Sequence, residues 1–154
     1  MRAQDWLLGI RLHVLEVAKM ELRVEELGSR ALPHGQRFDS VGHGGSGGGM
    51  DSTALAMVAA AQELDHERAV LARETDRALA VLYGRSGRGG LASERTSADA
   101  DVLCCYYLMG MGWEQTATEL CGDGERNSRQ WCIMRAKRAC EAIDRNGVAR
   151  LADS

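Results

Sequence analysis

The stretch YYLMGMGWEQTATEL, residues 106–120, decides the fold of the C-terminal part of the chain. Apolar residues precede Gly110 and Gly112, and a short segment that begins with Trp113 follows these two glycines. Glycine is favoured just after the last turn of a helix, where the backbone adopts a left-handed conformation. The pattern therefore predicts one helix that closes at the glycines, a tight turn, and a second helix over residues 113–120.

The flanking sequence supplies the other helix ends. Thr96–Asp99 has the capping-box pattern, so we expect a helix to begin there. Downstream, the turn CGDGERNS precedes a longer helix that begins at Asn127 or Ser128, runs to about Arg145 and is ended by Gly147. Three helices joined by one tight turn and one longer turn form the minimal helix-turn-helix unit.

The last of these helices has two chemically different faces. One stripe, typical of a buried helix face, contains Cys132, Ala136, Ala139, Cys140 and Ile143. The opposite side carries Arg126, Gln130, Met134, Lys137 and Arg138, with Arg129 and Arg135 on the flanks. A helix with such a basic, amide-bearing face can enter the major groove of DNA, where Arg reads guanine and Asn or Gln reads adenine. The alternative is an ordinary solvated face, but residues 126–138 contain five basic residues and no acid in a chain of net charge −3.

Two longer segments nearer the N-terminus repeat apolar residues at alternating steps of four and three. The first, Asp5–Leu27, has Trp6, Ile10, His13, Val17, Met20, Val24 and Leu27 on its seam and Gly28 as its expected end. The second, from about Asp51 to Leu82, has Met57, Ala61, Leu64, Arg68, Leu71, Thr75, Ala78 and Leu82. We expect an antiparallel, coiled-coil-like hairpin, and the longer second helix leaves apolar seam for a partner chain, which favours a homo-oligomer.

The expected fold class is all-α, with a long N-terminal helical hairpin and a C-terminal three-helix helix-turn-helix domain. The hairpin covers residues 1–83 with a glycine-rich loop over 28–49. The composition of residues 84–96, GRSGRGGLASERT, indicates a flexible linker. The helix-turn-helix domain then covers residues 97–147, and residues 148–154 form a tail.

Several function classes lack support in the sequence. The loop GHGGSGGGMDST contains a G-x-S-x-G pattern without a preceding strand, and Asp51 stands where a phosphate-binding loop needs Lys. The five cysteines lack the spacing of metal ligands and of a disulfide framework, and no catalytic set of residues emerges, so we expect no enzyme, cofactor or metal. The chain has neither an apolar run of membrane-spanning length nor a signal-peptide pattern, so we expect a cytoplasmic protein without a membrane partner.

The helix-turn-helix residues carry a family resemblance. The resemblance to the pattern Y-L-x-G-L-S-W-E-E-I-A-x-x-L-G runs through Tyr107, Leu108, Gly110, Met111, Trp113, Glu114, Ala117, Leu120 and Gly122. With these residues the chain resembles the fourth region of bacterial sigma factors, and more specifically the ArpU/RinA-type transcription regulators of phages and prophages. The resemblance extends over nearly the whole chain, including the glycine-rich loop before Asp51. The chain departs from the family pattern at Gly112, at Thr116 and in its longer turn before the last helix.

The resemblance implies a non-enzymatic, sequence-specific DNA-binding regulator of phage, prophage or mobile-element genes, with double-stranded DNA as partner and RNA polymerase as a further candidate. It places base contacts at Arg126, Asn127, Arg129 and Gln130, to which the basic face adds Lys137 and Arg138. The long turn leaves this register open by one turn. Glu114 would cap or orient the reader helix, and Trp113 would anchor its packing. The rival interpretation is a structural adaptor, such as a small terminase-like DNA-packaging or coiled-coil scaffold protein.

Overall fold

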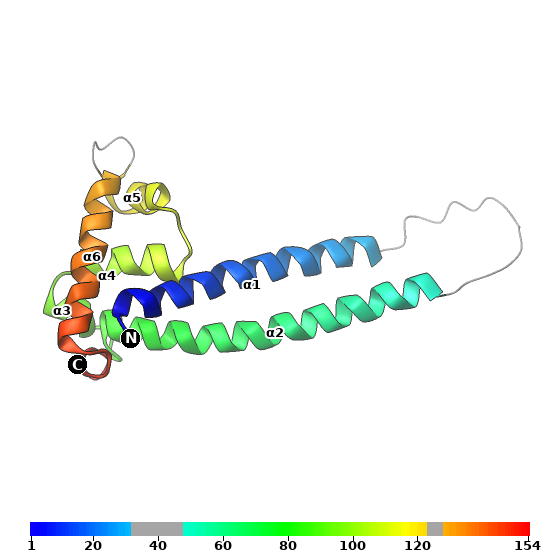
Figure 1. Cartoon of the computed structure of the whole chain (residues 1–154), viewed down its shortest axis with the longest axis horizontal. Coiled ribbons are helices and arrows are strands. Elements are labelled where there is room, and N and C mark those ends of the chain that lie inside the picture. Colours follow the sequence, from blue (N-terminus) through cyan, green and yellow to red (C-terminus); the bar gives the residue numbers. More distant parts are fainter. Residues whose placement is uncertain (32–47, 123–127) are drawn as a thin grey trace, which may run out of the picture. The chain divides into compact units, whose positions relative to one another are not determined.

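The computed structural model describes residues 1–31, 48–122 and 128–154, and within these ranges it contains helices and no strand (Figure 1). The helices are α1 (Ala3–Ala31), α2 (Gly48–Tyr83), α3 (Gly90–Glu94), α4 (Ser97–Leu103), the π-helical turn η1 (Cys104–Leu108), α5 (Trp113–Cys121), α6 (Ser128–Asn146) and α7 (Val148–Ala152). The predicted all-α class is therefore confirmed. Most of the predicted glycine-rich loop lies outside the described residues.

The chain forms two compact units, and each is described by itself. Unit 1 contains Met1–Leu15 and Val70–Ser154, and unit 2 contains Glu16–Ala69. The helices α1 and α2 each contribute residues to both units. This division differs from the predicted one, in which the whole of residues 1–83 formed a separate hairpin.

Unit 2 is a pair of antiparallel helical segments packed along the predicted seams (Figure 1). Val17 of α1 and Leu64 of α2 are buried, and the other apolar seam residues of the pair are half-buried. Arg68, the polar interruption of the second seam, lies at the surface, where its Nη2 is 2.6 Å from Oε1 of Glu21. The predicted end of the first helix is wrong, because α1 continues through Gly28 to Ala31.

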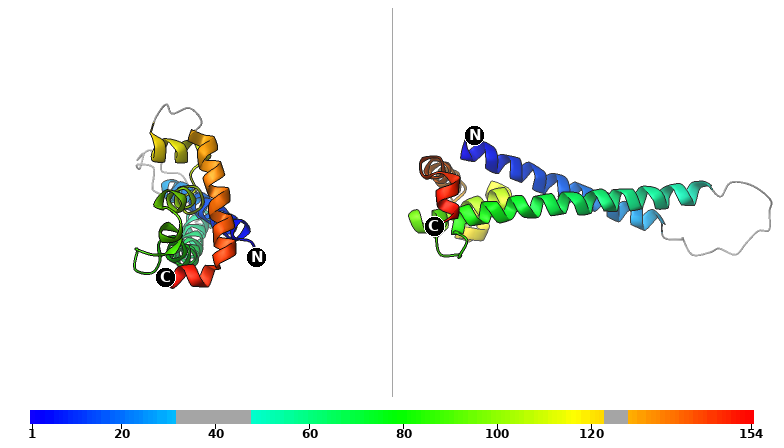
Figure 2. Two further views of the ribbon diagram at one scale, coloured as in Figure 1. Left: turned by 90° about the vertical axis from the view of Figure 1, so that its left-hand side faces the viewer. Right: turned by 90° about the horizontal axis from the view of Figure 1, so that it is seen from below.

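Unit 1 has a core to which every one of its helices contributes side chains. Figure 2 draws the ribbons of these helices from two further sides. Leu7 and Ile10 of the first turns of α1 are buried in this core, as are Val81 and Leu82 of the last turns of α2. The remaining large side chains of the core include Leu91, Val102, Leu103, Ile143 and Leu151. The ends of both long helices are therefore part of the C-terminal domain.

Residues 84–96 are not the flexible linker that their composition predicted. Leu91 of α3 is fully buried, and the glycines around it allow the backbone to approach very closely. A Cβ atom at Gly90, where φ is +64°, would lie 2.5 Å from the backbone nitrogen of Gly84. A Cβ at Gly89 would lie 2.3 Å from the carbonyl oxygen of Ser154. Glycine is required here by packing and backbone conformation, not by mobility.

The predicted tail is likewise structured. Leu151 of α7 is fully buried in the core of unit 1. The backbone N–H of Gly90 donates a hydrogen bond of 2.7 Å to Oγ of Ser154. These contacts fasten the last residues of the chain to the segment that was predicted to be a linker.

The predicted helix limits between residues 96 and 147 agree closely with the structure. Thr96 is the N-cap of α4, and its Oγ1 accepts a hydrogen bond of 3.3 Å from the backbone N–H of Asp99. Gly110 and Gly147 have φ angles of +71° and +83°, and they follow η1 and α6. The helices α4, α5 and α6 pack against one another, as the helix-turn-helix pattern requires. The π-helical form of η1 was not predicted.

Thr116 of α5 generates a stability prediction, because it is fully buried and its Oγ1 has no hydrogen-bond partner within the described parts of the chain. A buried polar group without a partner destabilises a fold by about 1–3 kcal/mol. Thr116→Val removes the hydroxyl and keeps the branched shape. We expect it to raise the free energy of unfolding by about 1 kcal/mol, measured by urea denaturation.

Thr118→Val is the matched control, because Thr118 is exposed on the same helix and its hydroxyl can bind water. The control should leave the free energy of unfolding nearly unchanged. A loss of stability in Thr116→Val would show that the hydroxyl has a partner that the structure does not contain.

Candidate nucleic-acid interface

The helix α6 is held in place by small buried side chains. Cys132, Ala136, Ala139, Cys140 and Ile143 are each at most 5% exposed, so the predicted buried stripe is confirmed. Burial raises the pKa of Cys132 to about 11 and that of Cys140 to about 12. Both thiols are therefore protonated and neutral at pH 7 and behave as small apolar residues. This face packs against α4 and α5, and the side chains on the opposite face of α6 are exposed within the described parts of the chain.

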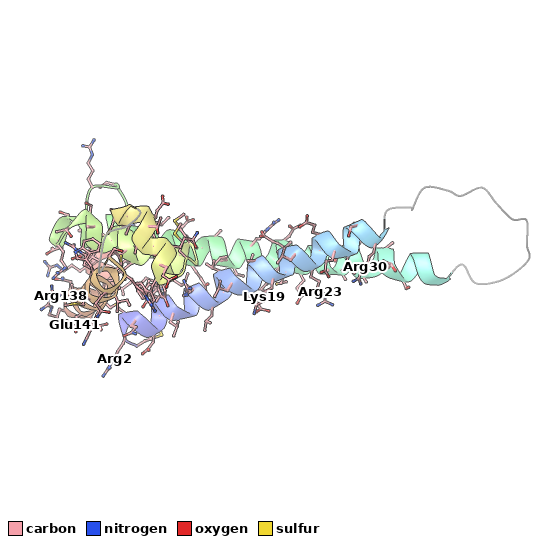
Figure 3. All side chains as sticks on the ribbon, turned by 90° about the horizontal axis from the view of Figure 1, so that it is seen from above. Arg2, Lys19, Arg23, Arg30, Arg138 and Glu141 are labelled. Carbon is pink, nitrogen blue, oxygen red and sulfur yellow. The ribbon has the colours of Figure 1, made fainter. Side chains whose placement is uncertain are left out.

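The opposite face exposes the residues predicted to meet DNA that fall within the described ranges. They are Arg129, Gln130, Lys137 and Arg138, together with the apolar Met134. Arg126 and Asn127, the other two predicted contacts, lie outside the described residues. The described part of α6 contains no acid up to Cys140, and the exposed Glu141 then follows beside Arg138 (Figure 3). The acid-free basic surface of α6 therefore lies in its first three turns, and the exposed Arg145 in the last turn follows Glu141 and Asp144.

Glu114 of α5 contacts α6 at its first turn. Its Oε1 lies 3.7 Å from Nη1 of Arg129, and both side chains are well exposed. An exposed ion pair of this length contributes less than about 1 kcal/mol to stability, but it restricts the direction of the Arg129 side chain. The start of α6, where Glu114 is expected to act as a cap, adjoins residues outside the described ranges, so the capping role stays a prediction. Of the two expected roles, only the orienting role is supported by a contact, which is the ion pair between Glu114 and Arg129.

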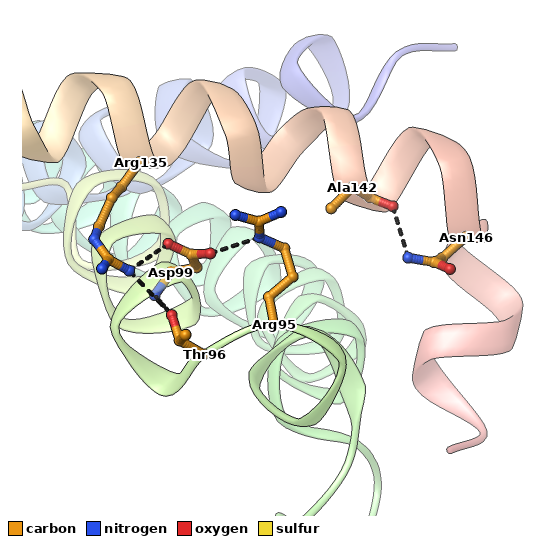
Figure 4. A network of polar contacts seen from close by, with 6 residues as sticks. All are labelled: Arg95, Thr96, Asp99, Arg135, Ala142 and Asn146. Atoms are coloured by element: carbon orange, nitrogen blue, oxygen red, sulfur yellow. Dashed lines mark hydrogen bonds and ion pairs between the residues drawn. The ribbon is translucent and has the colours of Figure 1, made fainter.

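Arg135, expected on the flank of the basic face, is instead bound inside unit 1 (Figure 4). Its Nη1 donates to Oδ1 of Asp99 at 2.7 Å and to Oγ1 of Thr96 at 3.0 Å. The other carboxylate oxygen of Asp99 accepts a hydrogen bond of 2.6 Å from Nε of Arg95. Asp99 is only 2% exposed, so one buried carboxylate joins the start of α4 to the middle of α6. Sequence analysis missed this pairing because Asp99 and Arg135 are far apart in the chain.

A second surface feature lies beside this ion pair. A shallow pocket of about 220 Å³ is lined by Arg95, Thr96, Asp99, Trp131, Met134, Arg135 and Arg138. The guanidinium carbon of Arg135 lies 4.4 Å from the centre of the Trp131 ring, a distance at which cation–π attraction operates. The exposed apolar side chains of Trp131 and Met134 thus border Arg138 on the candidate interface.

The turn between η1 and α5 is fixed by aromatic stacking. The rings of Tyr106 and Trp113 are nearly parallel, with centroids 3.6 Å apart, which agrees with the predicted anchoring role of Trp113. Arg11 of α1 lies 4.0 Å from the centre of the Tyr106 ring and donates hydrogen bonds to the carbonyl oxygens of Tyr106 and Met111. The part played by Arg11 was not predicted, because no local pattern connects α1 to this turn.

None of the protein-family models, curated proteins or solved structures compared with the chain matches it. Within the described residues no cluster of three His, Cys, Asp or Glu side chains could hold a metal ion. None of the described helices combines the length and the apolar character needed to cross a membrane. The chemistry of the exposed face of α6 is therefore the main guide to what this chain does.

The Asp99 ion pairs support a prediction about the stability of this site. Asp99→Asn would leave two partly buried guanidinium groups without their shared carboxylate. Hydrogen bonds to charged groups contribute about 1.5–3 kcal/mol each, so we expect the free energy of unfolding to fall by about 2–3 kcal/mol in urea denaturation.

Asp153→Asn is the matched control for Asp99→Asn. Its ion pair with Arg85, 3.2 Å between Oδ1 and Nη2, is exposed on both sides and contributes little to stability. Equal losses in the two variants would show that the Asp99 network has no special role.

Proposed function

We propose that the chain is a non-enzymatic, sequence-specific DNA-binding transcription regulator of phage, prophage or mobile-element genes, of the kind that its resemblance to ArpU/RinA-type regulators implies. The observation that carries the proposal is the division of α6 into a buried face of Cys and Ala and an exposed face with Arg129, Gln130, Lys137 and Arg138. A helix backed in this way can enter the major groove without exposing the core.

The positions of these side chains along α6 suggest different roles. Arg129 and Gln130 lie in the first turn, the part of a recognition helix that meets base edges in helix-turn-helix proteins. Lys137 and Arg138 lie two turns farther along, where cations neutralise phosphates. We assign base reading to the first pair, which Arg126 and Asn127 would extend, and phosphate anchoring to the second pair.

The proposal includes self-association and a cytoplasmic location. Pairing of two chains suits a helix-turn-helix regulator, because dimers read two half-sites. The cysteines within the described residues are free thiols, which suits a reducing compartment. RNA polymerase is a further proposed partner, on the resemblance alone.

The competing proposal is a structural adaptor, such as a small DNA-packaging subunit or a coiled-coil scaffold, in which the helical pair of unit 2 is the functional part. The exposed Leu55 and Val58 of α2 favour it, because apolar residues at the surface of a helical pair suit protein contacts. The two proposals differ in whether α6 discriminates between DNA sequences.

Alanine substitutions on α6 test the proposal. On a DNA site selected from random or genomic fragments, we expect Arg129→Ala to weaken binding by about 1–3 kcal/mol and to relax selectivity at one base pair. Lys137→Ala should weaken binding to all sequences alike and lower the slope of log affinity against log salt concentration by about one unit. Fluorescence anisotropy at several salt concentrations measures both effects.

Arg73→Ala is the control, because Arg73 is exposed on α2 away from α6 and its loss changes the net charge equally. It should leave affinity and selectivity unchanged. Because the long turn leaves the register open, Arg126→Ala and Gln130→Ala complete the set. Wild-type selectivity in all three variants at positions 126, 129 and 130 would contradict base reading by this helix and favour the adaptor.

A further inference from the structure

α1 carries a second apolar stripe that its own chain leaves exposed. Leu8, Leu12, Leu15 and Leu22 are 42%, 60%, 37% and 63% exposed, respectively. The first three follow steps of four and three, and Leu22 continues the same alternation with Lys19 as the intervening member. The residues of this stripe differ from those of the predicted seam, which pack within the chain.

We infer that this leucine stripe pairs two copies of the chain through a parallel, in-register coiled coil of their α1 helices. The inference deepens the self-association that is part of the proposed function, and it does not depend on DNA binding. Contiguous exposed leucines are uncommon on a monomer, and leucines at alternating steps of four and three are the pattern by which one helix packs against another.

The spacing favours a parallel arrangement of identical helices. In parallel, in-register pairing, each leucine of the stripe meets the same leucine of the second copy. Antiparallel pairing that sets Leu12 against Leu15 places Leu8 against Lys19 and Leu22 against Asp5. Shifting that register by one heptad either way again places a leucine of the stripe against Asp5 or Lys19. Parallel pairing therefore sets no leucine of the stripe against a charged residue, and it places Lys19 against Lys19 of the second copy.

The flanking charges favour the same arrangement. In a parallel coiled coil the residue just before the first seam position of each heptad, here position 12, 19 or 26, faces the residue five positions later on the partner helix. This rule pairs Glu25 with Arg30 of the second copy, and both side chains are exposed. It pairs Ala18 with Arg23, and none of the flanking pairs on α1 brings like charges together. Within the seam of the stripe, Lys19 and Glu26 meet the same residues of the second copy, and polar seam residues of this kind set register at a cost in stability.

The stripe continues onto the neighbouring surface of unit 1. A Cβ atom at Gly110 would lie 3.6 Å from Cδ2 of Leu15, so the turn after η1 adjoins the stripe. Met109 in this turn is 58% exposed and adds apolar surface. Because Leu8, Leu12 and Leu15 belong to unit 1, their pairing would hold together two copies of the unit that contains α6.

Sedimentation equilibrium of the full chain without DNA tests the pairing. We expect the wild type to sediment at twice its monomer mass of 16.7 kDa. Leu12→Glu should weaken dimerisation at least tenfold, because two carboxylates would meet in the interface. Leu12 is well exposed, so the variant should keep its fold, which circular dichroism and thermal unfolding verify.

Leu55→Glu is the matched control, because Leu55 is 70% exposed on α2 and lies outside the stripe. It should dimerise like the wild type. A monomeric wild type, a folded Leu12→Glu variant that still dimerises, or equal weakening by Leu55→Glu would each overturn the inference. A wild-type monomer that still selects a DNA site would overturn the pairing alone and leave the proposed DNA binding intact.

A charge exchange tests the orientation. Glu25→Arg and Arg30→Glu should each weaken dimerisation several-fold, because each brings like charges together, and the double variant should recover most of the loss. Recovery is expected only when residue 25 faces residue 30 of the other copy, as in parallel pairing. Additive losses in the double variant would overturn the parallel arrangement.

Discussion

The burial of Leu7 and Ile10 of α1 in the core of unit 1 is the constraint on which the C-terminal domain depends. Single cores below about 70–80 residues rarely supply enough stability on their own, and the helix-turn-helix segment of residues 97–147 falls below that size. The buried face of α6 consists largely of Ala and Cys, which bury little apolar area each. The large aliphatic side chains of α1, α2, α3 and α7 complete the core.

This dependence explains which parts of the fold were predictable from sequence. The limits of α4, α5 and α6 follow from Thr96, Gly110 and Gly147, whose effects act within one helical turn, and the buried stripe of α6 follows from helical periodicity. The linker and tail were misassigned because their roles are not local. In GRSGRGG the composition indicated mobility, whereas the glycines at 89 and 90 permit a close approach to backbone at Ser154 and Gly84.

In the candidate interface, too, the features that depend on local sequence patterns were predictable and those that depend on distant contacts were not. The exposure of Arg129, Gln130, Lys137 and Arg138 could be predicted, because each lies opposite the buried stripe. The withdrawal of Arg135 into the pair with Asp99 could not be, since it depends on how α4 approaches α6. One consequence is that the charge available to DNA is smaller than a count of basic residues indicates, because Asp99, shared with Arg95, partly offsets Arg135 and Glu114 partly offsets Arg129. Selectivity would then rest on a few directed side chains and not on a broad positive field.

α1 connects these features because it has three distinct surfaces. One surface packs against α2, and a second, formed by its first turns, completes the core of unit 1. On this second surface, Arg11 donates hydrogen bonds to the carbonyl oxygens of Tyr106 and Met111 and stacks on the Tyr106 ring. The Tyr106 ring in turn stacks on Trp113. The third surface is the leucine stripe, and Leu12 is the next residue after Arg11. A change in how the stripe is covered would therefore act directly beside the side chain that holds the turn before α5. Pairing of two chains and the placement of α5 and α6 within each chain are thus joined by adjacent residues of a single helix.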